Sequence, residues 1–244
     1  MKKALVIGIN SYPLPYQLQG CVNDANDYKA LLLSKGFSVA MLTNANATRT
    51  KILSALNTLT TGRRSGDNVV LAVSYHGSRV PDTSGDELDG YDECGVSVDM
   101  KAILDDEIRM YLGRLPAGVI TDVFMDCCYS GTGTRAKCVN VIGCRCVPGK
   151  AVKIGKKPKE LVIVPDLKHS LMAASGEGQL SAEILAGGVT PRGAFSYYLS
   201  QAIRAGGTRA SNVEYAAQRI AELGISQVPQ LEATETEANQ AVFT

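Results

Sequence analysis

Short apolar runs alternate with amphipathic segments along the first half of the chain. The apolar runs are continuous rather than alternating, which is typical of strands covered on both faces. The amphipathic segments repeat their apolar residues at helical spacing, and the first of them is followed by Gly36. This order predicts an α/β fold with a parallel sheet and right-handed crossovers. The expected strands are residues 4–9, 37–42, 68–75 and 119–125, and the expected helices are residues 22–35 and 48–59.

The pattern changes after Gly131. Residues 132–160 are rich in Gly, Lys, Arg and Cys and show little periodicity, so they predict one long loop. No internal repeat or domain boundary is visible, and we expect residues 1–244 to form a single domain. The later expected strands are residues 161–164, 170–174 and 228–231, and the later expected helices are residues 193–204 and 211–223.

Composition narrows the class of protein. The chain has 244 residues, 45% of them hydrophobic, which is enough for a full core. Its net charge of +1 gives no basic footprint for nucleic acid. No stretch approaches the roughly 20 apolar residues of a membrane helix, and the run at 4–9 is too short for a signal peptide. We therefore expect a cytoplasmic protein that binds neither nucleic acid nor membrane.

The chain has seven cysteines, an odd number, so they cannot all pair in disulfides. One is a candidate catalytic residue, and a reducing compartment fits the rest as free thiols. Cys138, Cys144 and Cys146 lie in the long loop and allow a zinc site as one hypothesis. They supply three local ligands, while His169 is distant in sequence. Unpaired loop thiols are the simpler interpretation.

A histidine and a cysteine follow two of the expected buried strands. His76 comes after the run at 68–75, and Cys128 after the run at 119–125. Reactive groups of a parallel sheet gather at the carboxyl ends of its strands, so these residues predict a nucleophile–base pair. The backbone N–H groups of Gly77 and Cys128 are expected to hold the developing oxyanion. A core histidine and a small buried thiol are the alternative interpretation.

Two competing residues stay open at this point. Cys127 is adjacent to Cys128, and neighbours in extended backbone point to opposite sides, so spacing does not decide which is the nucleophile. His169 is a second candidate base, but it precedes an expected strand rather than following one.

Several segments together resemble the metacaspases, the caspase-like cysteine peptidases. The resemblance covers about residues 4 to 204, and the separation of His76 from Cys128 also fits the caspase spacing. The matching segments are ALVIGIN with Gly20-Cys21-Val22-Asn23-Asp24-Ala25, Ser74-Tyr75-His76-Gly77, Asp126-Cys127-Cys128-Tyr129-Ser130-Gly131, and residues 173–183 and 193–199.

The resemblance implies a caspase-like three-layer sandwich, with a mostly parallel central sheet of about six strands flanked by helices. It implies that Cys128 is the nucleophile and His76 the general base of an endopeptidase. Its substrates would be peptides and proteins cut after Arg or Lys, and the protein would be a monomer.

An acidic specificity pocket is the next implication. Asp24 and Asp126 match acidic pocket positions of the family, and Cys21 and Ser74 match further lining positions. A pair of carboxylates attracts a guanidinium or ammonium group. Helix capping is the alternative role for Asp24. Asp126 ends an apolar strand, where an unpartnered acid is costly to bury.

Calcium is a further expectation. Asp92, Asp105 and Asp106 match the calcium-binding aspartates of calcium-dependent metacaspases, and Ca²⁺ prefers several carboxylates. Residues 132–135 lack the acid that the family has after its cysteine motif, and Tyr129 stands where histidine is frequent. A solvated acidic loop, with two aspartates at a helix start, is the alternative.

The basic loop suggests self-processing, since the enzyme would cut after Arg or Lys. An ordinary surface insertion is the alternative. A catalytically silent caspase-like scaffold and a peptidase with another P1 preference are the competing functions. The basic residues of this loop are Arg135, Lys137, Arg145, Lys150, Lys153, Lys156, Lys157 and Lys159.

Overall fold

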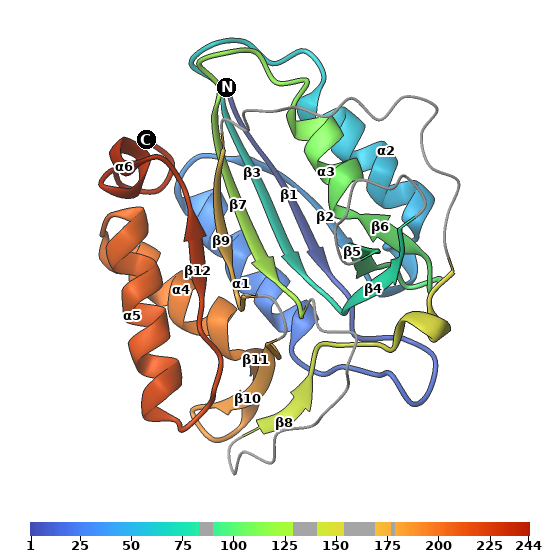
Figure 1. The fold of residues 1–244 in the computed structure, drawn as a ribbon. Coiled ribbons are helices and arrows are strands. Elements are labelled where there is room, and N and C mark those ends of the chain that lie inside the picture. The colour runs from blue at the N-terminus through green and yellow to red at the C-terminus, as the bar shows by residue number, and fades with distance from the viewer. Residues whose placement is uncertain (83–89, 129–140, 154–168, 177–178) are drawn as a thin grey trace.

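A six-stranded sheet forms the centre of the computed structural model, which describes residues 1–82, 90–128, 141–153, 169–176 and 179–244. The strand order within these residues is β12-β9-β7-β3-β1-β2, and every neighbouring pair is parallel except β12 with β9. Figure 1 shows the strands running side by side. The bounds are β1 (Lys2–Gly8), β2 (Ser38–Thr43), β3 (Asn68–Ser74), β7 (Ile120–Asp126), β9 (Ser170–Ala173) and β12 (Gln230–Glu232).

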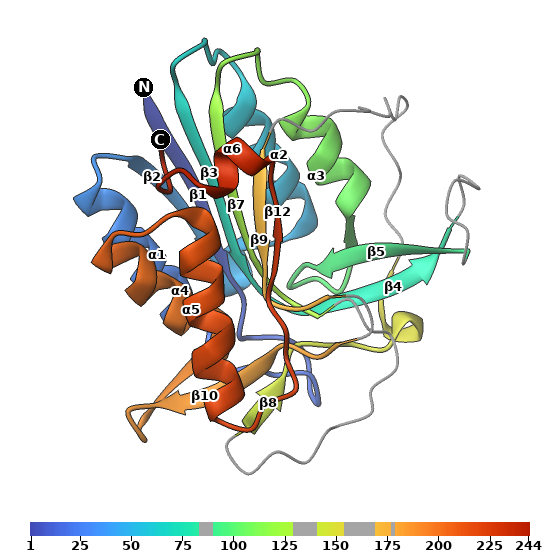
Figure 2. The same cartoon turned by 60° about the vertical axis from the view of Figure 1, so that its left-hand side comes forward.

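Helices cover both faces of this sheet (Figures 1 and 2). Successive strand residues point to opposite faces, so Leu71 joins one apolar cluster and Val70 joins the other. The first cluster includes residues of α2 (Arg49–Thr60) and α3 (Asp105–Leu112). The second includes residues of α1 (Cys21–Ser34), α4 (Ala194–Ala205) and α5 (Arg209–Glu222). The expected three-layer sandwich is therefore confirmed.

Helix α1 follows its sequence signals closely. Its buried face carries Ala25, Tyr28, Leu31 and Leu32, at the helical spacing that predicted it. Gly36 follows the helix with φ of +81°, a conformation that glycine adopts without steric cost. The start of this helix, at Cys21, therefore lies directly after the loop that leaves β1.

Two small antiparallel sheets lie beyond the carboxyl ends of the central strands (Figure 1). One runs directly on from β3, and the other brings together strands far apart in the chain. The first contains β4 (Gly77–Pro81), β5 (Tyr91–Val96) and β6 (Ala102–Leu104), and the second contains β8 (Val141–Cys144), β10 (Ala182–Ala186) and β11 (Thr190–Gly193).

The structure differs from the sequence-based expectation for part of the long loop. Strand β8 lies within the range 132–160, and residues Gly149–Ala151 form a 3-10 helix. Strand β8 pairs with β10, which is distant in sequence, so its local pattern carried little signal. The strand expected at 161–164 lies outside the described residues. Among the helices that are described, none combines the length and apolar character needed to span a membrane.

Candidate active site

Strand register brings His76 and Cys128 to the same sheet edge. Strands β3 and β7 are parallel neighbours, and their last registered pair is Ser74 with Asp126. His76 and Cys128 each lie two residues beyond that pair. Both side chains are buried, with 2% and 0% of their surface exposed.

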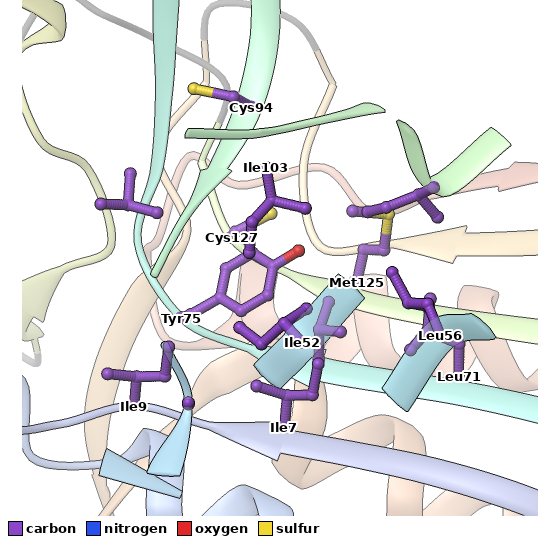
Figure 3. Packing of buried hydrophobic residues seen from close by; sticks show 14 of the residues in the cluster. Ile7, Ile9, Ile52, Leu56, Leu71, Tyr75, Cys94, Ile103, Met125 and Cys127 are labelled. Atoms are coloured by element: carbon purple, nitrogen blue, oxygen red, sulfur yellow. The ribbon is translucent and has the colours of Figure 1, made fainter. Parts of the chain in front are cut away.

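The two adjacent cysteines face different surroundings. Cys127 belongs to the apolar cluster that contains Tyr75 and Ile103, as Figure 3 shows. The thiol of Cys128 instead contacts the backbone of Ser181, whose N–H donates to Sγ. Alternation of side chains in extended backbone accounts for this division. Cys128 is therefore the cysteine that faces the site.

The orientation of His76 is set by a backbone carbonyl. Its Nε2 lies 2.7 Å from the carbonyl oxygen of Tyr16, which requires Nε2 to carry the proton. Nδ1 then has a free lone pair, and no hydrogen-bond partner for it is found in the described part of the chain. Burial lowers the pKa of His76 to about 4, against smaller opposing effects of the Tyr16 and Arg145 carbonyls. The imidazole is therefore neutral near pH 7 and can accept a proton.

Tyr12 supports the same histidine from a second direction. The two rings lie 4.6 Å apart between centroids. The Tyr12 hydroxyl accepts from the backbone N–H of His76 at 3.2 Å and donates to the carbonyl of Val96 at 2.7 Å. The N–H of Val96 donates directly to the carbonyl of His76 at 2.8 Å. The Tyr12 hydroxyl thus stands in place of a direct hydrogen bond from His76 N–H to the Val96 carbonyl, just before β4 begins. No sequence pattern predicted this role.

A segment of the chain itself fills the site. The carbonyl oxygen of Arg145 accepts from the N–H groups of Gly77 and Cys128, at 2.9 and 3.3 Å. These are the two donors that the sequence predicted for the oxyanion. The N–H of Arg145 donates to the carbonyl of Ser181 at 3.1 Å. The backbone of Arg145 is therefore held on both sides, through its carbonyl and through its N–H.

Gly77 allows this close approach because it lacks a side chain. A Cβ built at Gly77 would lie 1.6 Å from the carbonyl oxygen of Cys128, a contact that no side chain tolerates. The absence of a Cβ thus lets the segments that follow β3 and β7 approach each other, so that both N–H groups reach the Arg145 carbonyl.

The guanidinium of Arg145 lies in a closed acidic pocket. Its Nη2 is 2.5 Å from Asp24 Oδ2, and its Nη1 is 2.9 Å from Asp126 Oδ2. The Nη1 group also donates to the hydroxyl of Ser74 at 2.8 Å. The thiol of Cys21 is buried and is one of the groups that act electrostatically on this arginine. The structure thus gathers all four residues expected to form the specificity pocket.

Glu183 is a fifth pocket residue, which the sequence analysis missed. Its Oε1 lies 3.3 Å from Nη2 of Arg145 and accepts from the N–H of Gly20 at 2.8 Å. Its other oxygen accepts from the N–H of Gln19 at 3.1 Å. Nothing in the local pattern distinguished this acid from a solvated one, because its partners Gln19 and Gly20 are more than 160 residues away in the sequence.

Three buried carboxylates surround one guanidinium, so the pocket carries excess negative charge. Asp24 is not a helix cap; it accepts from Gly193 N–H, Ser74 and Arg145. Burial raises the pKa of Asp24 to about 7, while the charge of Arg145 opposes that rise. A neutral or acidic occupant would leave these carboxylates without a counter-charge. The guanidinium of Arg145 therefore compensates part of the charge of these carboxylates.

Burial shifts the pKa values of both His76 and Cys128 toward the neutral form. Burial raises the pKa of the Cys128 thiol well above its ordinary value, against a smaller lowering by the Ser181 N–H. With the pKa of His76 at about 4, both groups are neutral at pH 7.

The residues expected to bind calcium lie outside this site. Asp92 is on β5 and only 3% exposed, while Asp105 and Asp106 open α3. The charges of Asp105 and Asp92, together with burial, raise the pKa of Cys94, so these acids share one neighbourhood. Within the described residues, however, no group of three potential ligands is placed to hold a metal ion. The calcium site therefore stays a prediction.

The alternative base His169 lies away from the site, and the zinc hypothesis stays a prediction. His169 precedes β9, at the end of the sheet opposite to Cys128, since β9 runs parallel to β7. For the zinc hypothesis, Cys138 lies outside the described residues. Cys144 and Cys146 flank Arg145, and among the described residues they belong to no group of three potential metal ligands.

Comparison with known sequences identifies relatives of the N-terminal half. The family model described as metacaspase, peptidase C14 domain, matches residues 2–136. Metacaspase-1 of Cryptococcus neoformans is 38% identical over 145 residues, which cover 54% of this chain and 32% of that protein. Metacaspase-4 of Arabidopsis thaliana is 38% identical over 140 residues, covering 53% and 34%. The match thus spans about a third of the length of these curated relatives.

Comparison with solved structures covers the whole chain. A Geobacter sulfurreducens protein of known crystal structure is 28% identical, with a TM-score of 0.79, covering 100% of this chain and 99% of that one. Caspase-1 from Spodoptera frugiperda is 14% identical, with a TM-score of 0.64, covering 95% and 86%. The latter similarity concerns the fold alone.

Proposed function

Because this chain belongs to the metacaspase family of cysteine peptidases, we propose that it is an endopeptidase that cleaves after arginine or lysine. Cys128 acts as the nucleophile and His76 as the general base. Asp24, Asp126, Ser74, Cys21 and Glu183 form the pocket for the residue before the scissile bond. One observation carries the proposal: Arg145 of the chain itself occupies both the pocket and the predicted oxyanion donors.

The geometry accounts for each step of acyl transfer. Nδ1 of His76 takes the thiol proton while Sγ of Cys128 attacks the carbonyl carbon. The N–H groups of Gly77 and Cys128 stabilise the oxyanion, and a single such donor is typically worth about 10²–10³ in kcat. His76 then protonates the leaving amine, and water hydrolyses the thioester with His76 again acting as base.

Arginine should be preferred to lysine. The two terminal nitrogens of Arg145 contact different acids, Nη1 with Asp126 and Nη2 with Asp24 and Glu183. A lysine ammonium is a single point charge and does not reproduce this forked contact. Each neutral or acidic alternative leaves buried carboxylates unpaired.

Self-cleavage of the Arg145–Cys146 bond is part of the same proposal. The sequence offered eight basic candidates in the loop, and Arg145 is the one whose carbonyl lies between the two oxyanion donors. Since Arg145 reaches the site of its own chain, a monomer suffices for this first cut. Removal of Arg145 from the pocket is then required before another substrate binds.

Two experiments test the proposal. The first compares fluorogenic peptides that differ only in having Arg, Lys, Asp or Asn before the coumarin group. Faster hydrolysis of the Arg peptide, then Lys, is expected. A preference for Asp or Asn would contradict the pocket assignment, and no hydrolysis of any peptide would favour a silent scaffold.

The second experiment maps new N-termini after incubation of the protein. Wild-type and Cys127→Ala proteins should yield a fragment beginning at Cys146, and Cys128→Ala should remain intact. Cleavage that persists in Cys128→Ala and stops in Cys127→Ala would reverse the nucleophile assignment.

Calcium activation is a separate proposal, and no step above depends on it. It is supported by the shared neighbourhood of Asp92 and Asp105, and it needs further ligands beyond the described residues. Addition of calcium should raise the rate of the Arg peptide, and excess chelator should abolish it. Full activity in excess chelator would remove the proposal.

A further inference from the structure

The chain beyond Arg145 is held as closely as Arg145 itself. We propose that the enzyme also recognises the second residue after the scissile bond, through a closed apolar subsite at the start of β4. This subsite takes an aliphatic side chain such as valine and excludes charged ones. The inference rests on the proposed function and extends its substrate class to a basic residue followed two positions later by an aliphatic one.

Backbone contacts define the subsite. Val147 is the second residue after the Arg145–Cys146 bond, and its N–H donates to the carbonyl of Gly77 at 3.1 Å. The buried hydroxyl of Ser78 donates to the carbonyl of Val147 at 2.7 Å. Gly77 therefore contacts both sides of the bond, because its N–H also donates to the Arg145 carbonyl. A substrate held in this way is fixed in register over the thiol.

The side chain of Val147 is enclosed. None of its surface is exposed, and it belongs to the same apolar cluster as Val80 and Val152. Ser78 beside it is also fully buried. A carboxylate or ammonium at this position would lose its hydration, and the described contacts around Val147 offer it no counter-charge. Burial of this kind selects for apolar side chains.

The residues before the bond are held less deeply. Ile142, in strand β8, has 37% of its surface exposed, and the irregular register of β8 with β10 gives it no partner residue. After the bond, the chain stays attached as far as Lys153, whose N–H donates to the carbonyl of Met100 at 2.8 Å. The residues after the bond are thus held more closely than those before it, apart from Arg145. We therefore expect selection of substrates by side-chain shape to act on the residues after the scissile bond.

The test uses three quenched peptides based on residues 141–148, with both cysteines replaced by alanine: Val-Ile-Gly-Ala-Arg-Ala-Val-Pro and the same peptide with Asp or Lys in place of the second Val. We expect kcat/KM to fall about tenfold or more for the charged peptides, in line with the discrimination of apolar pockets. The matched control is a coumarin peptide that ends at Arg and has no residues beyond the bond. It measures the dyad and the acidic pocket alone.

The outcomes separate the two proposals. Equal kcat/KM for the three peptides, with normal hydrolysis of the coumarin peptide, would overturn the subsite and leave the proposed function intact. Failure to hydrolyse the coumarin peptide would overturn the proposed function, and the subsite with it. Ser78→Ala adds a second readout, because it should lower the ratio of the valine-peptide rate to the coumarin-peptide rate.

Self-cleavage provides an independent reading of the same subsite. Val147→Asp should slow the appearance of the Cys146 terminus about tenfold or more, whereas Lys150→Asp, which places the same charge at an exposed position of the same segment, should not. Equal rates for the two variants would contradict the inference. Far-ultraviolet circular dichroism of both variants checks that the fold is retained.

Discussion

Replacement of Arg145 by methionine tests how strongly the chain holds its own pocket. The change is made in the Cys128→Ala protein, so that no cleavage complicates the measurement. Arg145, Asp24, Asp126 and Glu183 each have at most 1% of their side chain exposed. Loss of one partner from a buried ion pair typically costs about 3–5 kcal/mol, because the remaining charge stays buried without compensation. We expect the free energy of unfolding to fall by about 3 kcal/mol or more.

The assay is urea unfolding at pH 7 followed by circular dichroism, since the chain has no tryptophan. Arg219→Met in the same background is the matched control. Its salt bridge with Glu222 joins side chains that are 44% and 46% exposed. Exposed pairs contribute roughly 0–1 kcal/mol, so the control should unfold nearly as the parent does.

A binding measurement completes the test. Methionine at position 145 leaves the acidic pocket without a cation, so a short peptide ending in arginine amide should bind the variant by calorimetry. The parent should bind it much more weakly, because a tethered side chain competes at an effective concentration on the order of millimolar. Unchanged stability together with unchanged peptide affinity would refute the idea that Arg145 neutralises the pocket.

Other predictions concern the histidine, the oxyanion donors and acid stability. Tyr12→Phe should lower kcat about tenfold with little change in KM, and should shift the pH profile of kcat. The reason is that the backbone N–H of His76 loses the Tyr12 hydroxyl as its acceptor. Equal loss of folding and activity would instead indicate a general structural role. Gly77→Ala should abolish self-cleavage, whereas Gly176→Ala, whose Cβ would meet no atom closer than 3.5 Å, should not. Burial lowers the pKa of His169 to about 4, so stability is lost as pH falls from 6.5 toward 4. In the inactive Cys128→Ala protein, urea unfolding gives the free energy of unfolding at pH 7 and at pH 4. His169→Asn should make the decrease between these two pH values smaller by roughly 2 kcal/mol. The same decrease in both proteins would contradict this.

The central sheet and the placement of His76 and Cys128 at one edge of it could be predicted because they follow general rules. Continuous apolar runs identify covered strands, and parallel strands deliver their following residues to one edge. Gly77 also followed from its place after the histidine. The four pocket residues Cys21, Asp24, Ser74 and Asp126 depended on resemblance to a family.

Other features depended on contacts that no local pattern encodes. Tyr12 meets Val96 across 84 positions of the sequence, and Glu183 meets Gly20 across 163. Strand β8 is short and partly exposed, and it forms by pairing with β10. The sequence offered Arg145 as one of several basic residues, and its position depends on contacts with Gly77, Cys128 and Ser181, which are distant in sequence.

The shared register of β3 and β7 has a consequence for how this architecture can vary in length. Removal of one residue within either strand would turn the following side chains to the other face of the sheet. His76 and Cys128 would then no longer be in register. The connection between the two strands includes β4, β5, β6 and α3, which pack into the core and are constrained in the same way. Loop length changes closure entropy only slowly, so insertions are best accommodated at exposed positions outside these elements and never inside them.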